Sequence, residues 1–376
     1  MKKADYLIIG GSAAGTTAAE VIRGLKPEAS IIIINDENHT QYSRVILKNY
    51  IRGEIDRERV FLKKDEWYKD KNIELLKGTR VEGLESSRKV VKLSNGDELG
   101  FEQLLIAVGG YVNKLSVSGA GLGNILYLRT IDDADSIIRA SEKSRNAIVV
   151  GGGFIGLDMV CSFKKIGVEH VTVIVREPYL WYGKLDEVSS RILTGVLVRN
   201  GVKVVAREEV SRFEEKNSSG EVGAAITKSG KKYEADVVCV GVGIKSDLSF
   251  LASSGVKINL GVETNEFLET NVPGIFAAGD CAQFQDVIFA RKHLVGNWAN
   301  ATSQGSAVGK TMAGVRTVFE TASSYSINFF EGACTFAGVT ESDFADRVIG
   351  RGSVEDKKMT RIFIKKPLRK RKRQLN

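Results

Sequence analysis

Cysteine and proline are scarce in this chain, and long apolar runs are missing. Four cysteines and four prolines occur among 376 residues. The cysteines form no C-x-x-C pair, so their spacing predicts neither a zinc site nor a local redox disulfide. Scattered single cysteines are typical of a reducing cytoplasm, which is the predicted location. They are Cys161, Cys239, Cys281 and Cys334. No run approaches about 18 apolar residues, so we expect no membrane span.

The amino terminus lacks the pattern of a signal peptide, and the body of the chain lacks a large net charge. In "MKKADYLIIGG", Asp5 interrupts a short apolar run, which favours a first β-strand over a signal peptide. The net charge is +8, but removing the seven charges of the segment "KKPLRKRKR" leaves +1. Such a run is typical of a solvated end. Nucleic acid is therefore not an expected partner, although contact of the tail with nucleic acid or acidic lipid is the alternative.

Glycine, in contrast, is abundant, with 39 residues, and it recurs in two similar turns. "YLIIGGSAAGTT" lies at 6–17 and "AIVVGGGFIGLD" at 147–158, and each is a buried-strand pattern that breaks into glycines and continues as a helical pattern. The second is a full G-x-G-x-x-G, whereas Ser12 takes the middle place in the first. Such a turn presents backbone N–H groups to a pyrophosphate. Two of them predict two dinucleotide sites, and ordinary glycine-rich strand ends are the alternative.

Strand and helix patterns alternate around both turns. Residues 72–110 are predicted as antiparallel strands with an N-G hairpin turn. The whole pattern predicts an α/β fold with two Rossmann-like dinucleotide-binding domains of the glutathione-reductase-like type, the second inserted in the first, and a short β-rich C-terminal domain. The predicted limits are 1–110 and 243–320 for the first domain, 111–242 for the second, 321–364 for the C-terminal domain and 365–376 for a basic tail.

With these motifs the sequence resembles the FAD-dependent pyridine nucleotide oxidoreductases over roughly residues 4–340. The most specific element is "TNVPGIFAAGD", whose last residue, Asp280, corresponds to the family's ligand of the FAD ribityl chain. A helix N-cap is the alternative role for Asp280. "QYSRVILKNYIRGEI" and "SINFFEGACTFAG" are most similar to rubredoxin and ferredoxin reductases and to the flavin portion of NAD(P)H nitrite reductases.

The resemblance implies that the first turn holds FAD without a covalent bond. "ENHTQYSR" is similar to the family's E-x-H-x-P-Y-x-R, which favours Glu37 over Asp36 as the ribose ligand. Arg44 is expected near the pyrophosphate or flavin and Lys48 near the isoalloxazine ring. The alternative is that the two form a surface basic pair on a helix. The backbone of Val81 is expected to meet the adenine. Trp298 is expected to cover one flavin face, or else to be a buried helix start. The implied FAD residues are Gly10, Ser12, Ala13, Ala14, Glu37, Arg44, Lys48, Val81, Ala107, Gly109, Gly279, Asp280 and Trp298.

The second turn is expected to hold NAD(P)H as a substrate. The family's NADH-selecting acid is replaced by Val175, and Arg176 follows, so NADPH is at least acceptable. A solvated strand end is the alternative for Arg176. The implied residues are Gly151, Gly153, Phe154, Ile155, Asp158, Arg176 and Gly243.

Two further positions depart from the family's pattern. Asp158 replaces a Glu that lies near the nicotinamide and flavin, sometimes paired with a Lys, so Lys48 and Asp158 are the predicted catalytic residues. In "GVGIKSD", Ser246 and Asp247 replace the usual Pro-Asn, which puts the local contact near the flavin in question.

The electron acceptor is inferred from what the sequence omits. The single Cys of disulfide-reducing relatives is missing from "QYSRVILKNYIRG", and no metal, haem or iron–sulfur ligand set is present. The sequence therefore predicts hydride transfer from NAD(P)H to FAD and onward transfer to a small redox protein, such as a ferredoxin or rubredoxin, or to a small molecule. An NAD(P)H oxidase and a nucleotide-sensing flavoprotein are the alternatives. Both monomer and homodimer stay open.

Overall fold

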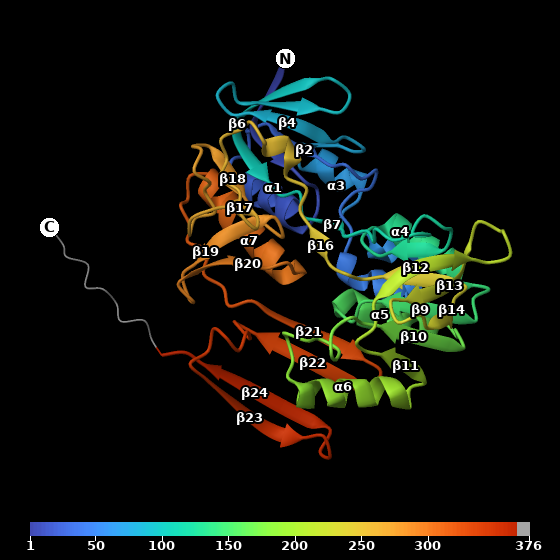
Figure 1. The fold of residues 1–376 in the computed structure, drawn as a ribbon. Helices are drawn as coiled ribbons and strands as arrows, with labels where there is room; N and C mark the ends of the chain where they lie inside the picture. The colour runs from blue at the N-terminus through green and yellow to red at the C-terminus, as the bar shows by residue number, and fades with distance from the viewer. Residues whose placement is uncertain (367–376) are drawn as a thin grey trace.

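The structure, a computed structural model, describes residues 1–366. A mixed seven-stranded sheet and a parallel five-stranded sheet lie beside each other, and two C-terminal hairpins lie below them in Figure 1. The predicted basic tail falls outside the described residues from position 367 onward. Up to residue 366, every helix is too short or too polar to cross a membrane.

The first sheet is built on buried apolar strands. β1 (Lys2–Ile9) and β2 (Ile31–Ile34) pair in parallel, and α1 (Ala13–Leu25) connects them. The four isoleucines of β2 are all buried, as expected for a strand covered on both faces. β3 (Ile73–Leu76) is parallel to β2, so the prediction of an antiparallel strand there is wrong. The helix α3 (Asp65–Asp70) supplies the crossover that a parallel strand requires.

An antiparallel meander completes this sheet on the other side of β1. β6 (Glu98–Ile106) runs parallel to β1, and β5 (Val90–Leu93) and β4 (Val81–Glu85) follow in antiparallel order. The predicted N-G turn joins β5 to β6, with Gly96 at a φ of +89°. β18 (Ile275–Ala277) returns much later to pair with β6. The seven strands thus come from two separate stretches of the chain.

The second sheet is wholly parallel and comes from one stretch. This stretch begins with β8 (Ile125–Tyr127), α4 (Ile131–Ser141), β9 (Asn146–Val150), α5 (Phe154–Lys165), β10 (His170–Ile174), α6 (Glu187–Arg199) and β11 (Val202–Val205). A small separate sheet follows, with β12 (Val210–Glu215), β13 (Val222–Thr227) and β14 (Lys232–Glu234), and β15 (Val237–Val240) then returns to the parallel sheet. The strand order is β11-β10-β9-β15-β8. Beside it, β12, β13 and β14 form a three-stranded antiparallel sheet.

Two short strands connect the sheets. β7 (Tyr111–Val112) and β16 (Ile244–Lys245) pair with each other in antiparallel order, and we call this pair the connecting ribbon. The predicted divisions at 110/111 and 242/243 fall beside it. A helical segment also reaches from the first sheet to α4 and α5. It consists of η1 (Arg44–Ile46), α2 (Leu47–Ile51) and η2 (Arg57–Val60).

The chain then returns to the first sheet through α7 (Trp298–Met312), which packs on α1. A Cβ at Gly305 would lie 2.4 Å from the Ala14 carbonyl oxygen, so only glycine allows this close approach. β21 packs on α5, and β24 packs on α6. The remaining elements are η3 (Ser249–Leu251), the sheet of β17 (Val262–Glu263), β19 (Ala282–Asp286) and β20 (Arg291–Leu294), and the hairpins β21 (Ser324–Phe329) with β22 (Gly332–Ala337) and β23 (Arg347–Ser353) with β24 (Lys358–Ile364).

Candidate functional site

The first glycine turn lies against the carboxyl end of β6. Gly10 has a φ of +112°, and a Cβ there would come within 2.2 Å of the Ala107 carbonyl oxygen. A Cβ at Gly15 would come within 1.9 Å of the Gly10 carbonyl oxygen. The Ser12 side chain makes no capping hydrogen bond at the start of α1. The turn therefore leaves the helix N-terminus open to an anion.

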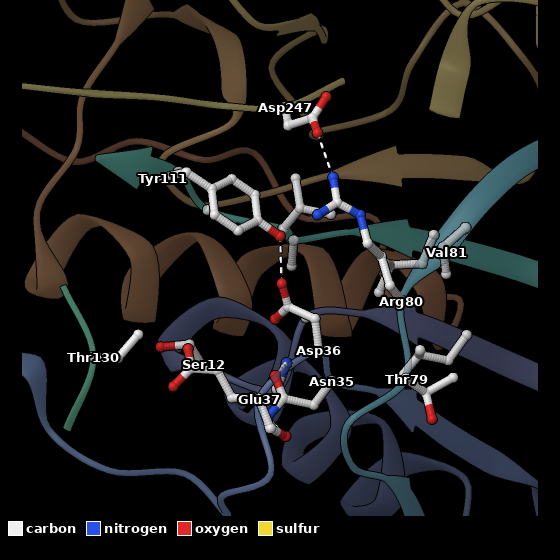
Figure 2. A pocket seen from close by; sticks show the side chains of 18 of the residues that line it. Ser12, Asn35, Asp36, Glu37, Thr79, Arg80, Val81, Tyr111, Thr130 and Asp247 are labelled. Atoms are coloured by element: carbon white, nitrogen blue, oxygen red, sulfur yellow. Dashed lines mark hydrogen bonds and ion pairs between the residues drawn. The ribbon is translucent and has the colours of Figure 1, made fainter. Parts of the chain in front are cut away.

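An open cavity lies in front of this turn (Figure 2). It lies outside the carboxyl ends of parallel strands, where ligands bind in open α/β sheets. The predicted FAD residues that line it are Gly10, Ser12, Glu37, Arg44, Val81, Ala107 and Gly109. The others, Ala13, Ala14, Lys48, Gly279, Asp280 and Trp298, do not line it.

Glu37 is held by two neighbours within the cavity wall. Its carboxylate forms an ion pair with Arg44 and accepts a hydrogen bond of 2.5 Å from the Tyr42 hydroxyl. Arg44 donates to the same hydroxyl at 2.9 Å. The Arg44 side chain is only 19% exposed, which contradicts the alternative of a surface cation. Asp36 lines the same cavity, and its carboxylate accepts a hydrogen bond from the Tyr111 hydroxyl.

Arg129 is a second cation of this cavity that the sequence analysis missed. It precedes α4, and its guanidinium lies 3.5 Å from Asp280. Burial and the nearby Arg44 lower the pKa of Arg129. The capping box that Thr130 and Asp133 form at the start of α4 fixes the backbone beside it. The capping box can be recognised in the sequence "RTIDDA", but this local pattern does not reveal that Arg129 lines a cavity of the first sheet.

The residues present fit a dinucleotide pyrophosphate. Within the described residues, the Nε atoms of Arg44 and Arg129 are buried without a hydrogen-bond partner. Both arginines line the cavity in front of the glycine turn. Buried polar atoms without partners are rare in proteins, and a phosphate is the acceptor that guanidinium groups match best. An anion between the two cations would also relieve their mutual repulsion.

The carboxyl end of β18 supplies two further predicted FAD residues, Gly279 and Asp280. Gly279 has a φ of +83°, and its N–H donates to the Gln304 side chain at 2.7 Å. A Cβ there would lie 3.2 Å from Ala14 on α1. Asp280 lies between β18 and β19, so the alternative of a helix N-cap is wrong. Trp298 is the first residue of α7 and is half-buried, which leaves both of its predicted roles open.

The second glycine turn repeats the backbone strain of the first. Gly151 has a φ of +101°, and a Cβ there would lie 2.5 Å from the Gly241 carbonyl oxygen. A Cβ at Gly156 would lie 2.0 Å from the Gly151 carbonyl oxygen. Gly153 precedes α5 and has no atom within 4 Å of its Cβ direction. The turn thus leaves the N-terminus of α5 open, beside Ile155.

Apolar and aromatic side chains surround this second turn. A Cβ at Gly152 would lie 2.5 Å from Leu180 and 2.8 Å from Val175. The Phe154 ring packs on three other rings, with centroid distances of 4.7, 5.1 and 6.0 Å to Trp181, Tyr325 and Phe336. These rings join the N-terminus of α5 to the C-terminal hairpin β21–β22.

The predicted selectivity positions differ in exposure. Val175 is buried, whereas the Arg176 side chain is 75% exposed and pairs with Glu177 at 2.9 Å. Arg176 is therefore free to turn toward a ligand at low cost, because exposed ion pairs are weak. Gly243 has a φ of +100° beside the connecting ribbon, and its carbonyl accepts from the Asn113 N–H at 2.9 Å.

Lys48 and Asp158 meet between the two sheets. The Lys48 Nζ on α2 lies 3.0 Å from the Asp158 carboxylate on α5. Arg52 lies 3.9 Å from the same carboxylate and donates to the Asp158 carbonyl at 3.3 Å. Burial raises the pKa of Asp158, while Lys48 opposes the shift. The shorter Asp side chain still reaches the lysine, so the pair links the first sheet to the start of α5.

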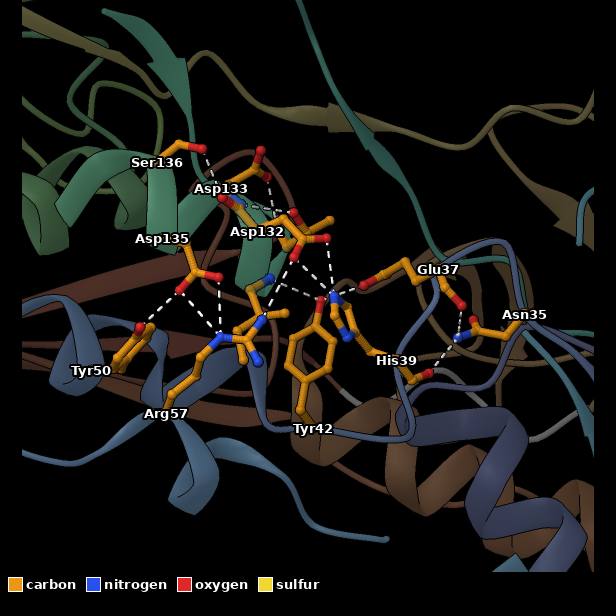
Figure 3. Close-up of polar contacts among 12 residues, drawn as sticks. Asn35, Glu37, His39, Tyr42, Tyr50, Arg57, Asp132, Asp133, Asp135 and Ser136 are labelled. Atoms are coloured by element: carbon orange, nitrogen blue, oxygen red, sulfur yellow. Dashed lines mark hydrogen bonds and ion pairs between the residues drawn. The ribbon is translucent and has the colours of Figure 1, made fainter. Parts of the chain in front are cut away.

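Further polar contacts hold α4 against the first sheet (Figure 3). His39 Nε2 lies 2.9 Å from one Asp132 oxygen, and Arg57 lies 3.0 Å from Asp135. Tyr50 donates to Asp135 at 2.7 Å. Because α4 precedes β9 of the second sheet, these contacts fix the relative position of the two glycine turns.

All four thiols are poor nucleophiles. Burial raises the pKa of Cys161 and Cys334 to about 11 and that of Cys239 and Cys281 to about 12. None of the four forms a disulfide. Since the thiolate is the reactive form, the structure offers no cysteine suited to disulfide exchange at neutral pH.

These features define a class of protein with two strand–glycine turn–helix units and a largely buried Lys48–Asp158 ion pair between α2 and α5. The sequence matches the family described as pyridine nucleotide-disulphide oxidoreductase over residues 4–305. The chain belongs to this family, and the predicted resemblance is confirmed. It is therefore a flavoprotein oxidoreductase of the class that uses pyridine nucleotides.

Known relatives refine this assignment. The rubredoxin–NAD(+) reductase of Pseudomonas putida is 28% identical over 312 residues, 83% of this chain and 80% of that protein. A nitrite reductase (NAD(P)H) of Bacillus subtilis is 29% identical over 319 residues, but this chain covers only 38% of its length. The crystal structure of a covalent putidaredoxin reductase–putidaredoxin complex matches with a TM-score of 0.91 at 27% identity, covering 97% of this chain and 88% of that chain. This likeness confirms the predicted fold class.

Proposed function

We propose that this protein is an FAD-dependent NAD(P)H reductase that delivers electrons to a small iron–sulfur protein of the ferredoxin or rubredoxin type. The observation that carries the proposal is the Lys48–Asp158 pair, 3.0 Å apart, between the two glycine turns. In this proposal, a nicotinamide on the second turn would meet a flavin on the first beside this pair. Each turn alone binds a dinucleotide; a shared charged contact between them supports transfer from one to the other.

The residues of the first site have distinct tasks in this proposal. The turn at Gly10 and the guanidinium groups of Arg44 and Arg129 would hold the FAD pyrophosphate. Asp280 would accept hydrogen bonds from the ribityl hydroxyls. When bound, FAD supplies a ring that accepts a hydride from NAD(P)H and releases electrons singly.

Lys48 and Asp158 would act at the other end of the cofactor. The Lys48 ammonium would donate a hydrogen bond to the flavin and place positive charge where negative charge develops during reduction. Asp158 would orient Lys48, and Arg52 beside it keeps that carboxylate partly neutralised. The chain's own contribution is thus orientation and charge.

The cysteines support an external acceptor rather than a disulfide. With pKa values of about 11 to 12, all four thiols stay protonated at neutral pH. Relatives named for rubredoxin and putidaredoxin support a small iron–sulfur protein as this acceptor. We further propose that NADPH is accepted, because Val175 and Arg176 offer no acid for the ribose and one cation for a 2′-phosphate.

The test is anaerobic stopped-flow reduction of the purified protein by NADH and by NADPH, followed through flavin absorbance. We expect fast bleaching with at least one donor, and then reoxidation by an added ferredoxin or rubredoxin. Reoxidation by oxygen alone, with no response to either iron–sulfur protein, would favour an NAD(P)H oxidase. A flavin that neither donor reduces would contradict the reductase and favour a nucleotide sensor.

A further inference from the structure

Two side-chain contacts close the outer end of the flavin cavity (Figure 2). The Tyr111 hydroxyl donates to the Asp36 carboxylate, and Arg80 forms an ion pair with Asp247. The Arg80 guanidinium also lies over the Tyr111 ring, 5.5 Å from its centroid. All four residues line the cavity. The two contacts therefore form one continuous cluster at the mouth.

The cluster joins parts of the chain that are far apart in sequence. Asp36 follows β2, and Arg80 precedes β4, so both belong to the first sheet. Tyr111 lies on β7, and Asp247 follows β16, so both belong to the connecting ribbon. Each contact thus ties the ribbon to the first sheet across the cavity.

The ribbon is itself anchored beside the cavity by a residue that departs from the family's pattern. The Ser246 hydroxyl donates to the Gly109 carbonyl at 2.6 Å. Gly109 also lines the cavity. Asp247 is the second departure, and it makes the ion pair of the cluster. Ser246 and Asp247, the two residues that depart from the family's pattern, therefore both hold the connecting ribbon beside the cavity.

The position of the cluster indicates which half of the cofactor it would contact. Thr79, Arg80 and Val81 line the same end of the cavity, and Val81 is the residue expected to meet the adenine. Lys48 and Asp158, expected at the flavin ring, do not line this cavity. The cluster therefore faces the adenosine half and lies away from the reacting atoms.

We propose that Tyr111 and Asp247, held by Asp36 and Arg80, form a latch that retains the adenosine half of FAD in its site. The inference rests on the proposed binding of FAD to the first turn. The latch opens only when the connecting ribbon moves away from the first sheet. It thereby slows cofactor release without taking part in hydride transfer.

The two contacts contribute by different means. Tyr111 is 37% exposed, and partial burial together with the hydrogen bond to Asp36 raises the pKa of its hydroxyl, which therefore stays protonated and donates throughout the neutral range. The Arg80 and Asp247 side chains are 50% and 37% exposed, so their ion pair is weak alone and sensitive to salt. We therefore expect the tyrosine contact to account for most of the retention.

The test measures FAD release from the loaded protein after dilution, as a rise in flavin fluorescence. Tyr111→Phe removes one hydrogen bond, and we expect release to accelerate about threefold to tenfold. Asp247→Asn should accelerate it about twofold at low salt, and the double variant should exceed either change. The rate at which NAD(P)H reduces the flavin that stays bound should not change.

Matched variants separate the latch from a general loss of stability. Tyr233→Phe removes a hydroxyl from β14, and Glu209→Gln breaks the exposed pair with Lys228, 2.8 Å long; neither should alter FAD release. The melting temperature of the apo-proteins should be equal. Wild-type release rates in Tyr111→Phe and Asp247→Asn would overturn the latch and leave the reductase standing. A wild-type protein that binds no FAD would overturn the proposed function itself.

Discussion

The two glycine turns share one backbone path but have different surroundings. At both, a Cβ on the first glycine would lie within 2.5 Å of a carbonyl oxygen of a neighbouring strand end, at Ala107 or Gly241. The first opens into a cavity with two buried guanidinium groups, at Arg44 and Arg129. The second faces Val175, Leu180 and the rings around Phe154. The turn itself supplies only backbone N–H groups for an anion, and residues distant in sequence determine which ligand binds there.

This contrast fits the different tasks proposed for the two sites. A resident cofactor gains from buried guanidinium groups whose Nε donors have no partner, because such donors hold its phosphates tightly. A substrate that must leave after each turnover gains from a site with fewer fixed charges. The first turn therefore suits FAD, and the second suits NAD(P)H.

The largest effect is expected from Gly10→Ala and Gly151→Ala, which place the same strain in each turn. Each combines a positive φ with a clash against a strand carbonyl. We expect Gly10→Ala to be isolated without flavin, and Gly151→Ala to keep flavin but lose more than about tenfold in its reduction by NAD(P)H. Absorbance spectra and stopped-flow rates measure both.

Gly24→Ala on α1 is the control for these variants. No atom lies within 4 Å of its Cβ direction. The change should stabilise the protein by about 0.5–1 kcal/mol and leave flavin bound. If Gly10→Ala also retains its flavin, the first turn is not the cradle.

The next effect concerns the ion pair between the sites. Asp158→Asn removes the carboxylate that holds Lys48 at 3.0 Å, and Lys48→Met removes the cation. We expect each to slow flavin reduction about tenfold to 100-fold while the flavin content stays normal. Asp158→Glu keeps the charge and should recover most of the rate. Wild-type rates of flavin reduction in both Asp158→Asn and Lys48→Met would remove the pair from the mechanism.

Arg129→Gln tests the cation that distinguishes the first site. Loss of a buried charge-assisted contact should weaken FAD affinity about tenfold to 100-fold. Arg139→Gln, on the helix α4 that follows Arg129, removes an exposed arginine that donates to Ser136 and should have no effect. Titration of the apo-proteins with FAD measures both affinities. Unchanged affinity in Arg129→Gln would show that this guanidinium does not contact the cofactor.

A smaller effect is expected at Arg176. Arg176→Gln should lower kcat/KM for NADPH about threefold to tenfold and leave the value for NADH unchanged, since only NADPH carries the 2′-phosphate. Glu177→Gln releases Arg176 from its ion pair and should shift the preference toward NADPH. Steady-state rates with both donors decide this, and a parallel fall in both would contradict a selective role.

The smallest effect, on stability, is expected at two carboxylates that lie far from both turns and hydrogen-bond to the starts of neighbouring strands. Burial works to raise the pKa of Asp236, but hydrogen bonds from Lys216, Asn146 and Arg145 lower it to about 2. A lowered folded-state pKa means that the stabilisation is present above the unfolded value of 3.8 and is lost as pH falls toward about 2. Asp236→Asn should therefore cost about 1–2 kcal/mol at pH 7 and little near pH 2.

Asp5 is the counterpart in the first sheet. The backbone and side chain of Ser30 lower its pKa, but Asp5 is exposed. Asp5→Asn should show a weaker pH dependence than Asp236→Asn. Denaturant unfolding at several pH values measures both, and equal curves would contradict this difference.

Local patterns in the sequence were sufficient for the elements and for both turns. Glycines that must adopt a positive φ, and strands such as the four isoleucines of β2, leave few alternatives once the chain is buried. The strand at 73–76 was assigned the wrong direction, because its partner β2 lies about 40 residues earlier and no local pattern reports that pairing. Arg129 was missed for the same reason, since its cavity belongs to a different sheet.

The sequence by itself determined two anion cradles, each on its own strand, turn and helix, because short-range sterics fix these units. It also determined that no cysteine pair is close in sequence. Only the tertiary structure decided that Lys48 reaches Asp158, that Arg44 and Arg129 share one cavity, and that Tyr111 closes its mouth. These contacts join residues about 75 to 110 positions apart, and packing of the two sheets across the ribbon creates them.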